Sequence, residues 1–209
     1  PHHAPFRTDF TDRRATPPAA EVLKRMGIDS AGGHDISDPS NQCAPSSPPY
    51  VLAMQQRVTV LQTKNNVTLL YSQDDQVRHI RLNASHPVHP KPSAMGDSIG
   101  HYEGDTMVID TVGVKIGRVT MVDRYSTPQS PALQLVERYR LIEVAEAKAA
   151  MDRHEKRAGL VGVPPGAVPL DPNYGKALQL QYTVEDPNVF TMPWSAQVTY
   201  RHTTLPWSE

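Results

Sequence analysis

The sequence of residues 96–111, GDSIGHYEGDTMVIDT, predicts a β-hairpin and decides the fold class of the chain. Residues 98–102 form one short strand, and residues 103–105 form the turn. Residues 106–112 form a return strand rich in β-branched side chains. The turn contains Gly104, which adopts a positive φ without steric cost. The hairpin therefore anchors a β-rich fold.

The two faces of the return strand differ in their chemistry, because successive side chains point to opposite sides of a strand. One face carries Met107, Ile109 and Thr111. The other face carries Asp110 between Val108 and Val112. A carboxylate inside a strand and among valines is a candidate site residue.

Further strands are predicted on both sides of the hairpin by apolar alternation and turn residues. They cover residues 50–63 (divided near Gln56), 67–72, 77–83, 119–124, 132–141, 178–185 and 196–203. Eight to ten short strands with antiparallel turn signals and few helices predict a mainly β fold. We expect an antiparallel β-barrel or strongly curved sheet of the lipocalin-like kind, and a β-sandwich is the alternative.

Two helices are expected outside the sheet. Thr16 as N-cap, Pro17 at the first helical position and Gly27 as the stop predict a short N-terminal helix. Alanines and a closing glycine predict a second, surface helix within an insertion at about 143–175. We therefore divide the chain into an N-terminal arm, helix and loop (1–49) and a β-barrel domain (50–209).

The composition excludes several classes of protein. The 21 basic and 22 acidic residues show no Lys/Arg run, so nucleic acid is not an expected partner. No run of 18 apolar residues exists, so no membrane span is expected. The single cysteine, Cys43, lacks an activating motif and is interpreted as a half-buried small residue. The arm of residues 1–15 is expected to lie on the barrel itself or on a neighbouring subunit, which would make a homo-oligomer.

The 96–111 stretch resembles the signature of a family of uncharacterised, exported bacterial β-rich proteins, Gly-Asp-Ser-Ile-Gly, an aromatic, Glu-Gly-Asp-Thr, an aliphatic run and Asp-Thr. Residues 130–139, 183–187 and 190–194 also resemble later segments of that family, and the resemblance covers roughly 38–200. It implies export to the periplasm or the extracellular space, with no established activity. A first residue other than Met fits a mature protein whose leader has been removed.

Glu137 is the clearest candidate catalytic residue. It shares a strand face with Leu133, Leu135, Tyr139 and Leu141, where an unpaired carboxylate would be costly. Either it lies exposed near a barrel end or it has a partner. The partners considered are a strand arginine, His79, Arg81, His101, Tyr200 and His202.

His101 and Asp110 complete the candidate catalytic group. His101 lies near the end of its strand, beside carboxylates, where a histidine serves as a general base or as a surface partner. Trp194 either floors a ligand pocket or plugs one barrel end. The residues proposed to bind a ligand are Arg138, Tyr139, His79, Arg81, Trp194 and Tyr200.

No cofactor or metal is expected from the motifs. His86 and His89 have a plausible metal-ligand spacing, but they lie in proline-rich sequence without a clear third ligand. A nucleophile elbow, a phosphate loop and a dinucleotide fingerprint are all absent from the sequence.

Two functions remain open. The first is an exported binding module or structural subunit for a small apolar or aromatic ligand or a partner protein. The second is a cofactor-free acid/base enzyme, such as an isomerase, lyase or hydrolase, with its site in the barrel cavity. Convergence of Glu137, Asp110 and His101 in one pocket favours the enzyme, whereas an interior filled by side chains favours the binding module.

Overall fold

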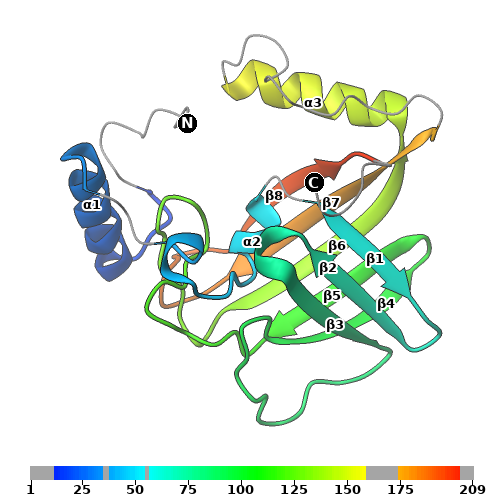
Figure 1. Ribbon diagram of the computed structural model, residues 1–209, viewed down its shortest axis with the longest axis horizontal. Helices are drawn as coiled ribbons and strands as arrows, with labels where there is room; N and C mark the ends of the chain where they lie inside the picture. The colour runs from blue at the N-terminus through cyan, green and yellow to red at the C-terminus, as the bar shows by residue number, and fades with distance from the viewer. Residues whose placement is uncertain (1–11, 35–37, 55–56, 159–173, 203–209) are drawn as a thin grey trace.

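A computed structural model describes residues 12–34, 38–54, 57–158 and 174–202, and it shows an eight-stranded sheet curled into a half-barrel (Figure 1). The prediction of a mainly β, strongly curved sheet is confirmed. The strands follow one another across the sheet in chain order: β1 (Val58–Gln62), β2 (Asn66–Tyr71), β3 (Gln76–Leu82), β4 (Asp97–Glu103), β5 (Thr106–Val112), β6 (Gln134–Glu143), β7 (Lys176–Glu185) and β8 (Trp194–Tyr200).

One pair of neighbouring strands is parallel. β3 and β4 pair in the same direction, with Ile80 opposite Ser98 and Leu82 opposite Gly100, and every other neighbouring pair of strands is antiparallel. The predicted antiparallel pairing does not hold for this one pair. The connection at 83–96 is long enough to carry the chain back to the end of the sheet where β3 begins.

The half-barrel has an open seam between its first and last strands. Within the described part of the chain, β1 pairs only with β2, and β8 pairs only with β7. Tyr102 of β4 nevertheless reaches toward β1 and donates a hydrogen bond to Gln62 Oε1 at 3.0 Å. The sheet is therefore a deep curl, and the closed-barrel alternative does not apply to the described strands.

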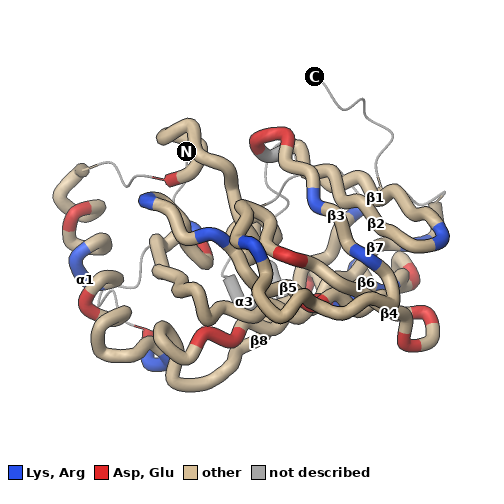
Figure 2. The backbone as a smooth tube through the Cα atoms, turned by 90° about the horizontal axis from the view of Figure 1, so that it is seen from below, with Lys and Arg blue, Asp and Glu red and all other residues tan. Residues whose placement is uncertain are grey.

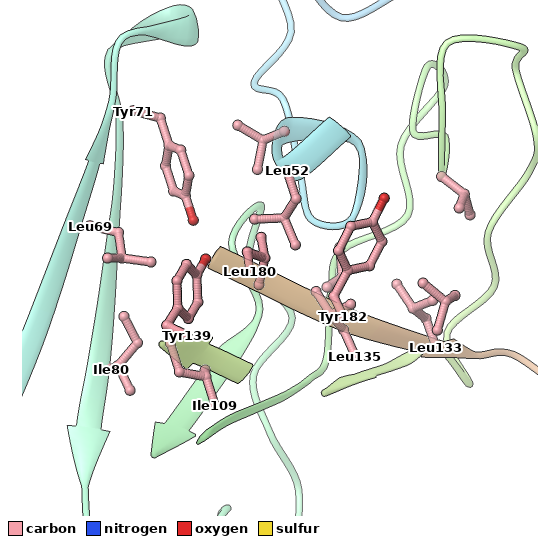
Figure 3. Close-up of a cluster of buried hydrophobic side chains, with 14 of the residues drawn as sticks. Leu52, Leu69, Tyr71, Ile80, Ile109, Leu133, Leu135, Tyr139, Leu180 and Tyr182 are labelled. Carbon is pink, nitrogen blue, oxygen red and sulfur yellow. The ribbon is translucent and has the colours of Figure 1, made fainter. Parts of the chain in front are cut away.

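The concave face of the curl holds the hydrophobic core (Figure 3). Alternate residues of β2 to β7 point into it, as strand geometry requires. The buried apolar members include Val67, Leu69, Tyr71, Ile80, Met107, Ile109, Leu135, Tyr139, Leu180, Tyr182 and Val184. The predicted faces of the 106–112 strand are confirmed, because Met107, Ile109 and Thr111 are buried on the concave side.

Helix α2 (Tyr50–Ala53) and several loops add residues to this core. Val51 and Leu52 of α2 pack with Val122, and all three are fully or almost fully buried. The strand expected to begin at residue 50 is wrong at its start, because residues 50–53 form one helical turn. The strand expected at 119–124 is also wrong: this segment is an irregular loop that buries its valines in the core.

The N-terminal helix α1 (Pro17–Ala31) is longer than predicted. Its apolar face buries Ala19, Leu23 and Gly27, and the helix passes Gly27 to end at Gly32. Thr16 precedes the helix but does not cap it with its side chain; its hydroxyl donates to the Asn188 backbone carbonyl at 3.0 Å. That bond ties the start of α1 to the β7–β8 connection.

Helix α3 (Val144–Ala158) confirms the predicted surface helix. Figure 1 shows it extending beyond the sheet from the end of β6. Its Ala147 packs against Ile142 and Ala177 on the convex face. The remainder of the insertion, 159–173, and the arm residues 1–11 lie outside the described residues. No described helix has both the length and the apolar character needed to cross a membrane.

Two short 3₁₀ turns, η1 (Ser40–Gln42) and η2 (Gln73–Asp75), complete the described elements. Charged residues are spread over strands, helices and loops, and Figure 2 shows basic and acidic positions interspersed along the backbone. This distribution agrees with the nearly balanced composition of 21 basic and 22 acidic residues.

Candidate functional site

The 96–111 stretch places polar residues on both faces of the sheet. Ser98 of β4 and Thr111 of β5 lie opposite each other on the concave face, and their hydroxyl oxygens are 2.9 Å apart. Asp97 and Asp110 are their sequence neighbours and point to the convex face. The hairpin therefore contributes to two separate polar clusters.

The concave cluster centres on an ion pair between Arg78 of β3 and Glu137 of β6. Arg78 Nη2 donates to Glu137 Oε1 at 2.5 Å, and Arg78 Nη1 donates to Glu137 Oε2 at 3.1 Å. Their side chains are 1% and 0% exposed. Glu137 is therefore buried and paired with a strand arginine, and the other partners considered, His79, Arg81, His101, Tyr200 and His202, do not bond to it.

The remaining donors of Arg78 are also satisfied. Its Nε donates to Ser98 Oγ at 3.0 Å, its Nη2 to Thr111 Oγ1 at 2.5 Å, and its Nη1 to Tyr71 Oη at 3.5 Å. Tyr139 donates to Glu137 Oε2 at 2.9 Å. All five guanidinium N–H groups thus have acceptors, so the cluster offers a ligand no unused Arg78 donor.

Burial and charge fix the protonation states of the concave cluster. Burial raises the pKa of Tyr71, and burial together with Glu137 raises the pKa of Tyr139 well above its usual range. Burial lowers the pKa of Arg78, but the Glu137 carboxylate together with Tyr71 and Tyr139 outweighs burial, so the pKa of the guanidinium is raised. Figure 3 shows the hydroxyls of Tyr71 and Tyr139 pointing toward one another. Near neutral pH the tyrosines are neutral and Arg78 is charged, as a structural cluster requires.

The convex cluster joins the 83–96 loop to the sheet through His86. His86 Nδ1 lies 2.6 Å from Asp97 Oδ1, and Arg81 Nη2 donates to the same oxygen at 3.0 Å. His86 Nε2 lies 3.7 Å from Asp110 Oδ2. Asp110 also accepts two hydrogen bonds from Gln134 Nε2, at 3.0 and 3.1 Å.

An Asp–His pair of this kind suits proton transfer only where the second ring nitrogen meets a substrate. Here His86 Nε2 is buried and has no hydrogen-bond partner among the described residues. The ring is therefore placed to fasten the loop rather than to exchange a proton with a bound molecule.

The three predicted catalytic residues do not converge. Glu137 lies on the concave face, whereas His101 and Asp110 lie on the convex face. His101 is exposed, and its Nε2 lies 3.2 Å from Glu103 Oε1. Bonds from Arg138 and then His101 lower the pKa of Glu103. The convergence that would favour the enzyme alternative is therefore not seen among these three residues.

The predicted ligand-binding residues are similarly divided between the two faces. Arg138 donates to Glu103 Oε2 at 2.6 Å, and His79 Nδ1 lies 3.2 Å from Thr68 Oγ1, both on the exposed convex side. Arg81 belongs to the His86 cluster, and Tyr139 to the buried Glu137 cluster. These four residues do not form one binding surface.

Trp194 and Tyr200 of β8 pack along the concave face. The Trp194 ring makes edge contacts with Phe190 and Tyr182, at centroid distances of 5.7 and 6.1 Å, and the Arg14 guanidinium lies 5.0 Å from its centroid. Tyr200 donates to the Leu52 carbonyl at 3.5 Å. Both aromatic residues pack against the core.

A separate cavity of about 260 Å³ lies among the loops that flank the hairpin. We call it the loop cavity. It is lined by Gln42, Ala44, Pro45, Ser47, Ala94, Lys115, Gly117, Arg118, Val119 and Thr120. Most of the lining is apolar, and two cationic side chains border it, so the cavity suits a small molecule with an apolar body.

Hydrogen bonds between loops hold the walls of the loop cavity. Ser93 donates its backbone N–H to Gly113 O at 3.2 Å, and Lys115 donates its backbone N–H to Ser93 O at 2.8 Å. Thr120 Oγ1 accepts from the Gly117 N–H at 3.0 Å and closes the turn that carries Arg118. These bonds fix the walls that residues 94 and 115–120 form.

Cys43 lies between two lining residues, Gln42 and Ala44, and is exposed, so its interpretation as half-buried is wrong. Its φ of 50° is the reason, because a left-handed residue at the end of η1 turns its side chain out of the packed loop. None of the residues that line the loop cavity was among the predicted site residues. Nothing in local sequence patterns brings 42–47, 94 and 115–120 together.

Arg78 was missed for a different reason. The candidate partners from this strand, His79 and Arg81, share the face of Val77, which is 46% exposed, whereas Arg78 shares the concave face with Ile80 and Leu82. Because Ile80 and Leu82 outnumber Val77, the apolar pattern of the strand indicated that the face of Arg78 is the buried one.

Within the described residues, no group of three or more His, Cys, Asp or Glu side chains is arranged to hold a metal ion. Comparisons of the chain with protein-family models, with curated proteins and with solved structures gave no match. The function must therefore be argued from the geometry of the site.

Proposed function

We propose that this protein is an exported β binding module that holds a small apolar or aromatic ligand in the loop cavity. The observation that carries the proposal is the cavity itself, a preformed space of about 260 Å³ with walls from three loops. Pockets for small molecules are typically concave and mostly apolar, with a few polar groups. The size of the cavity restricts the ligand to a small molecule.

Two further observations support binding over catalysis. The concave face of the sheet is covered by the side chains of the hydrophobic core, so this face serves packing. The candidate acid/base residues Glu137, His101 and Asp110 lie on opposite faces, and each has a structural partner. An acid/base mechanism needs such groups within reach of one substrate.

The proposal of export rests on the resemblance of the 96–111 stretch to exported proteins. Fractionation of cells that make the protein from its natural gene tests it. Recovery in the periplasm or the medium is expected, and recovery with the cytosolic proteins would contradict it.

Binding is tested by titrating the full chain with N-phenyl-1-naphthylamine, a neutral aromatic probe that fluoresces in apolar surroundings. We expect saturable binding at one site. Cys43 carries the only thiol of the chain and lies beside the cavity, so a thiol-attached environment-sensitive dye at this residue reports where the probe binds. Its emission is expected to change over the same range of probe concentration.

A pair of variants locates the site. Ala44→Trp fills the loop cavity from its wall, and we expect it to weaken binding of the probe about tenfold or more. Ala84→Trp adds the same side chain at an exposed position outside the lining and is expected to leave binding unchanged. Unsaturable binding, or equal binding by both variants with native circular dichroism spectra, would overturn the proposal.

A further inference from the structure

The charged side chains that line the loop cavity are both cationic. Lys115 and Arg118 are part of its lining, and the described residues that line it include no carboxylate. An apolar wall with two cations at its border concentrates a positive potential inside a concave surface. Such a surface attracts anions more strongly than the same charges on an open face.

Other arginines of the fold are engaged in ion pairs. Arg78 pairs with Glu137, Arg81 with Asp97 and Arg138 with Glu103. Within the described residues, neither Lys115 nor Arg118 forms a salt bridge or a side-chain hydrogen bond. Both cations therefore keep their full donor capacity for a bound molecule.

The two side chains differ in what they offer. The guanidinium of Arg118 presents a planar set of N–H donors that matches the two oxygens of a carboxylate or the oxygens of a sulfonate. The ammonium of Lys115 is a compact charge on a flexible stem. Together they suit one anionic group at the border of the cavity, while Ala44, Pro45 and Val119 suit an apolar body inside it.

We propose that the loop cavity selects ligands that carry one anionic group on a small apolar or aromatic body. The inference rests on the proposed function, since it names the chemical class of ligand for the same cavity. The anionic group contacts Arg118 and Lys115, and the apolar part lies against the loop walls.

A matched pair of probes tests this inference. N-phenyl-1-naphthylamine and 8-anilinonaphthalene-1-sulfonate share the same ring system and differ by the sulfonate. The wild-type chain is expected to bind the sulfonate probe about tenfold more tightly at low salt, because two exposed charge pairs, each worth up to about 1 kcal/mol, together contribute on that scale. Added salt is expected to reduce this preference and to leave binding of the neutral probe nearly unchanged.

Two double variants provide the control. Lys115→Gln with Arg118→Gln is expected to remove the preference for the sulfonate probe and to leave the neutral probe bound as before. Lys24→Gln with Arg25→Gln changes the net charge equally on the exposed side of α1 and is expected to keep the preference.

The outcomes separate the two proposals. If the neutral probe binds in the loop cavity but the sulfonate probe binds no better, the anion inference fails and the binding function stands. Equal loss of sulfonate binding in both double variants would mean that only net charge matters, which also overturns the inference. If the neutral probe does not bind in the loop cavity of the wild-type chain, the proposed function itself is wrong.

Discussion

The side chain of Arg78 in β3 extends across β4 and β5 on the concave face and forms a bidentate ion pair with Glu137 of β6. It bonds to Ser98 of β4 and Thr111 of β5 on the way. One side chain thus ties four neighbouring strands together in the interior. A buried ion pair of this kind is costly to break on one side, because the remaining charge loses its partner.

The first prediction concerns this pair. Glu137→Gln leaves the buried guanidinium without its counter-charge and is expected to lower the free energy of unfolding by about 3–5 kcal/mol. The double variant Arg78→Met, Glu137→Leu removes both charges and is expected to lose less than Glu137→Gln alone. Urea unfolding followed by circular dichroism measures both. A loss below about 1 kcal/mol for Glu137→Gln would show that Arg78 does not depend on this carboxylate.

The second prediction concerns Gly96, which has a φ of 70° and lies against β5. A Cβ at this position would come within 2.8 Å of both Thr111 Cγ2 and Val112 O. Gly96→Ala is expected to lower the unfolding free energy by about 3 kcal/mol through left-handed strain and overpacking.

Gly104 is the matched control for Gly96. It has a similar φ of 62° in the hairpin turn, but a Cβ there would meet nothing within 4 Å. Gly104→Ala therefore isolates the cost of the left-handed backbone, about 1 kcal/mol. Equal losses in the two variants would mean that the contact with β5 relaxes without cost.

The third prediction concerns alkaline stability. Burial raises the pKa of Tyr182 to about 12, and burial also raises the pKa values of Tyr71, Tyr139 and Tyr200. An unfolded tyrosine ionises near pH 10, so the unfolded chain loses these protons first. The stabilisation is complete below about pH 10 and is lost as the pH rises from there toward the folded-state values.

Unfolding free energies at pH 8 and pH 11 measure this loss. Tyr182→Phe removes one of the four phenols and is expected to make the decrease between the two pH values smaller. An identical decrease in the wild type and in Tyr182→Phe would show that Tyr182 does not contribute to the loss of stability at alkaline pH.

The fourth prediction concerns the His86 contact with the sheet. His86→Ala removes the 2.6 Å contact with Asp97 and is expected to lower the unfolding free energy by about 1–2 kcal/mol. The amides of Ser93 and Lys115, which join the 83–96 loop to the segment after β5, are expected to exchange hydrogen faster. His89→Ala, at an exposed position of the same loop, should leave both rates unchanged.

The hairpin of 96–112 was predictable because its signals are local. Gly104 supplies the turn conformation, and alternation assigns the faces of Met107, Ile109 and Asp110 without knowledge of distant residues. The strand of Glu137 and the insertion helix followed from the same kind of pattern. Helix α3 was recognisable because its alanines favour a helix wherever they lie.

The errors arose where burial was decided by distant contacts. Residues 50–53 and 119–124 are short apolar segments, and such segments do not reveal whether they form a strand or a buried loop. The loop cavity and the Arg78–Glu137 pair each join segments far apart in the chain. The pair forms because β3 and β6 belong to one curved sheet, and the cavity forms where three separate loops meet.

The single parallel pairing divides the sheet into two antiparallel groups, β1–β3 and β4–β8. Each group is built from strands that are neighbours in sequence, and the 83–96 connection between the groups is shorter than the 113–133 and 144–175 connections inside the second group. A chain cut within that connection would yield two fragments whose antiparallel ladders are each complete. Their reassembly would join the short β3–β4 ladder, the Arg78–Glu137 pair and the two halves of one shared core, which makes this connection a candidate cut site for a split-protein reporter.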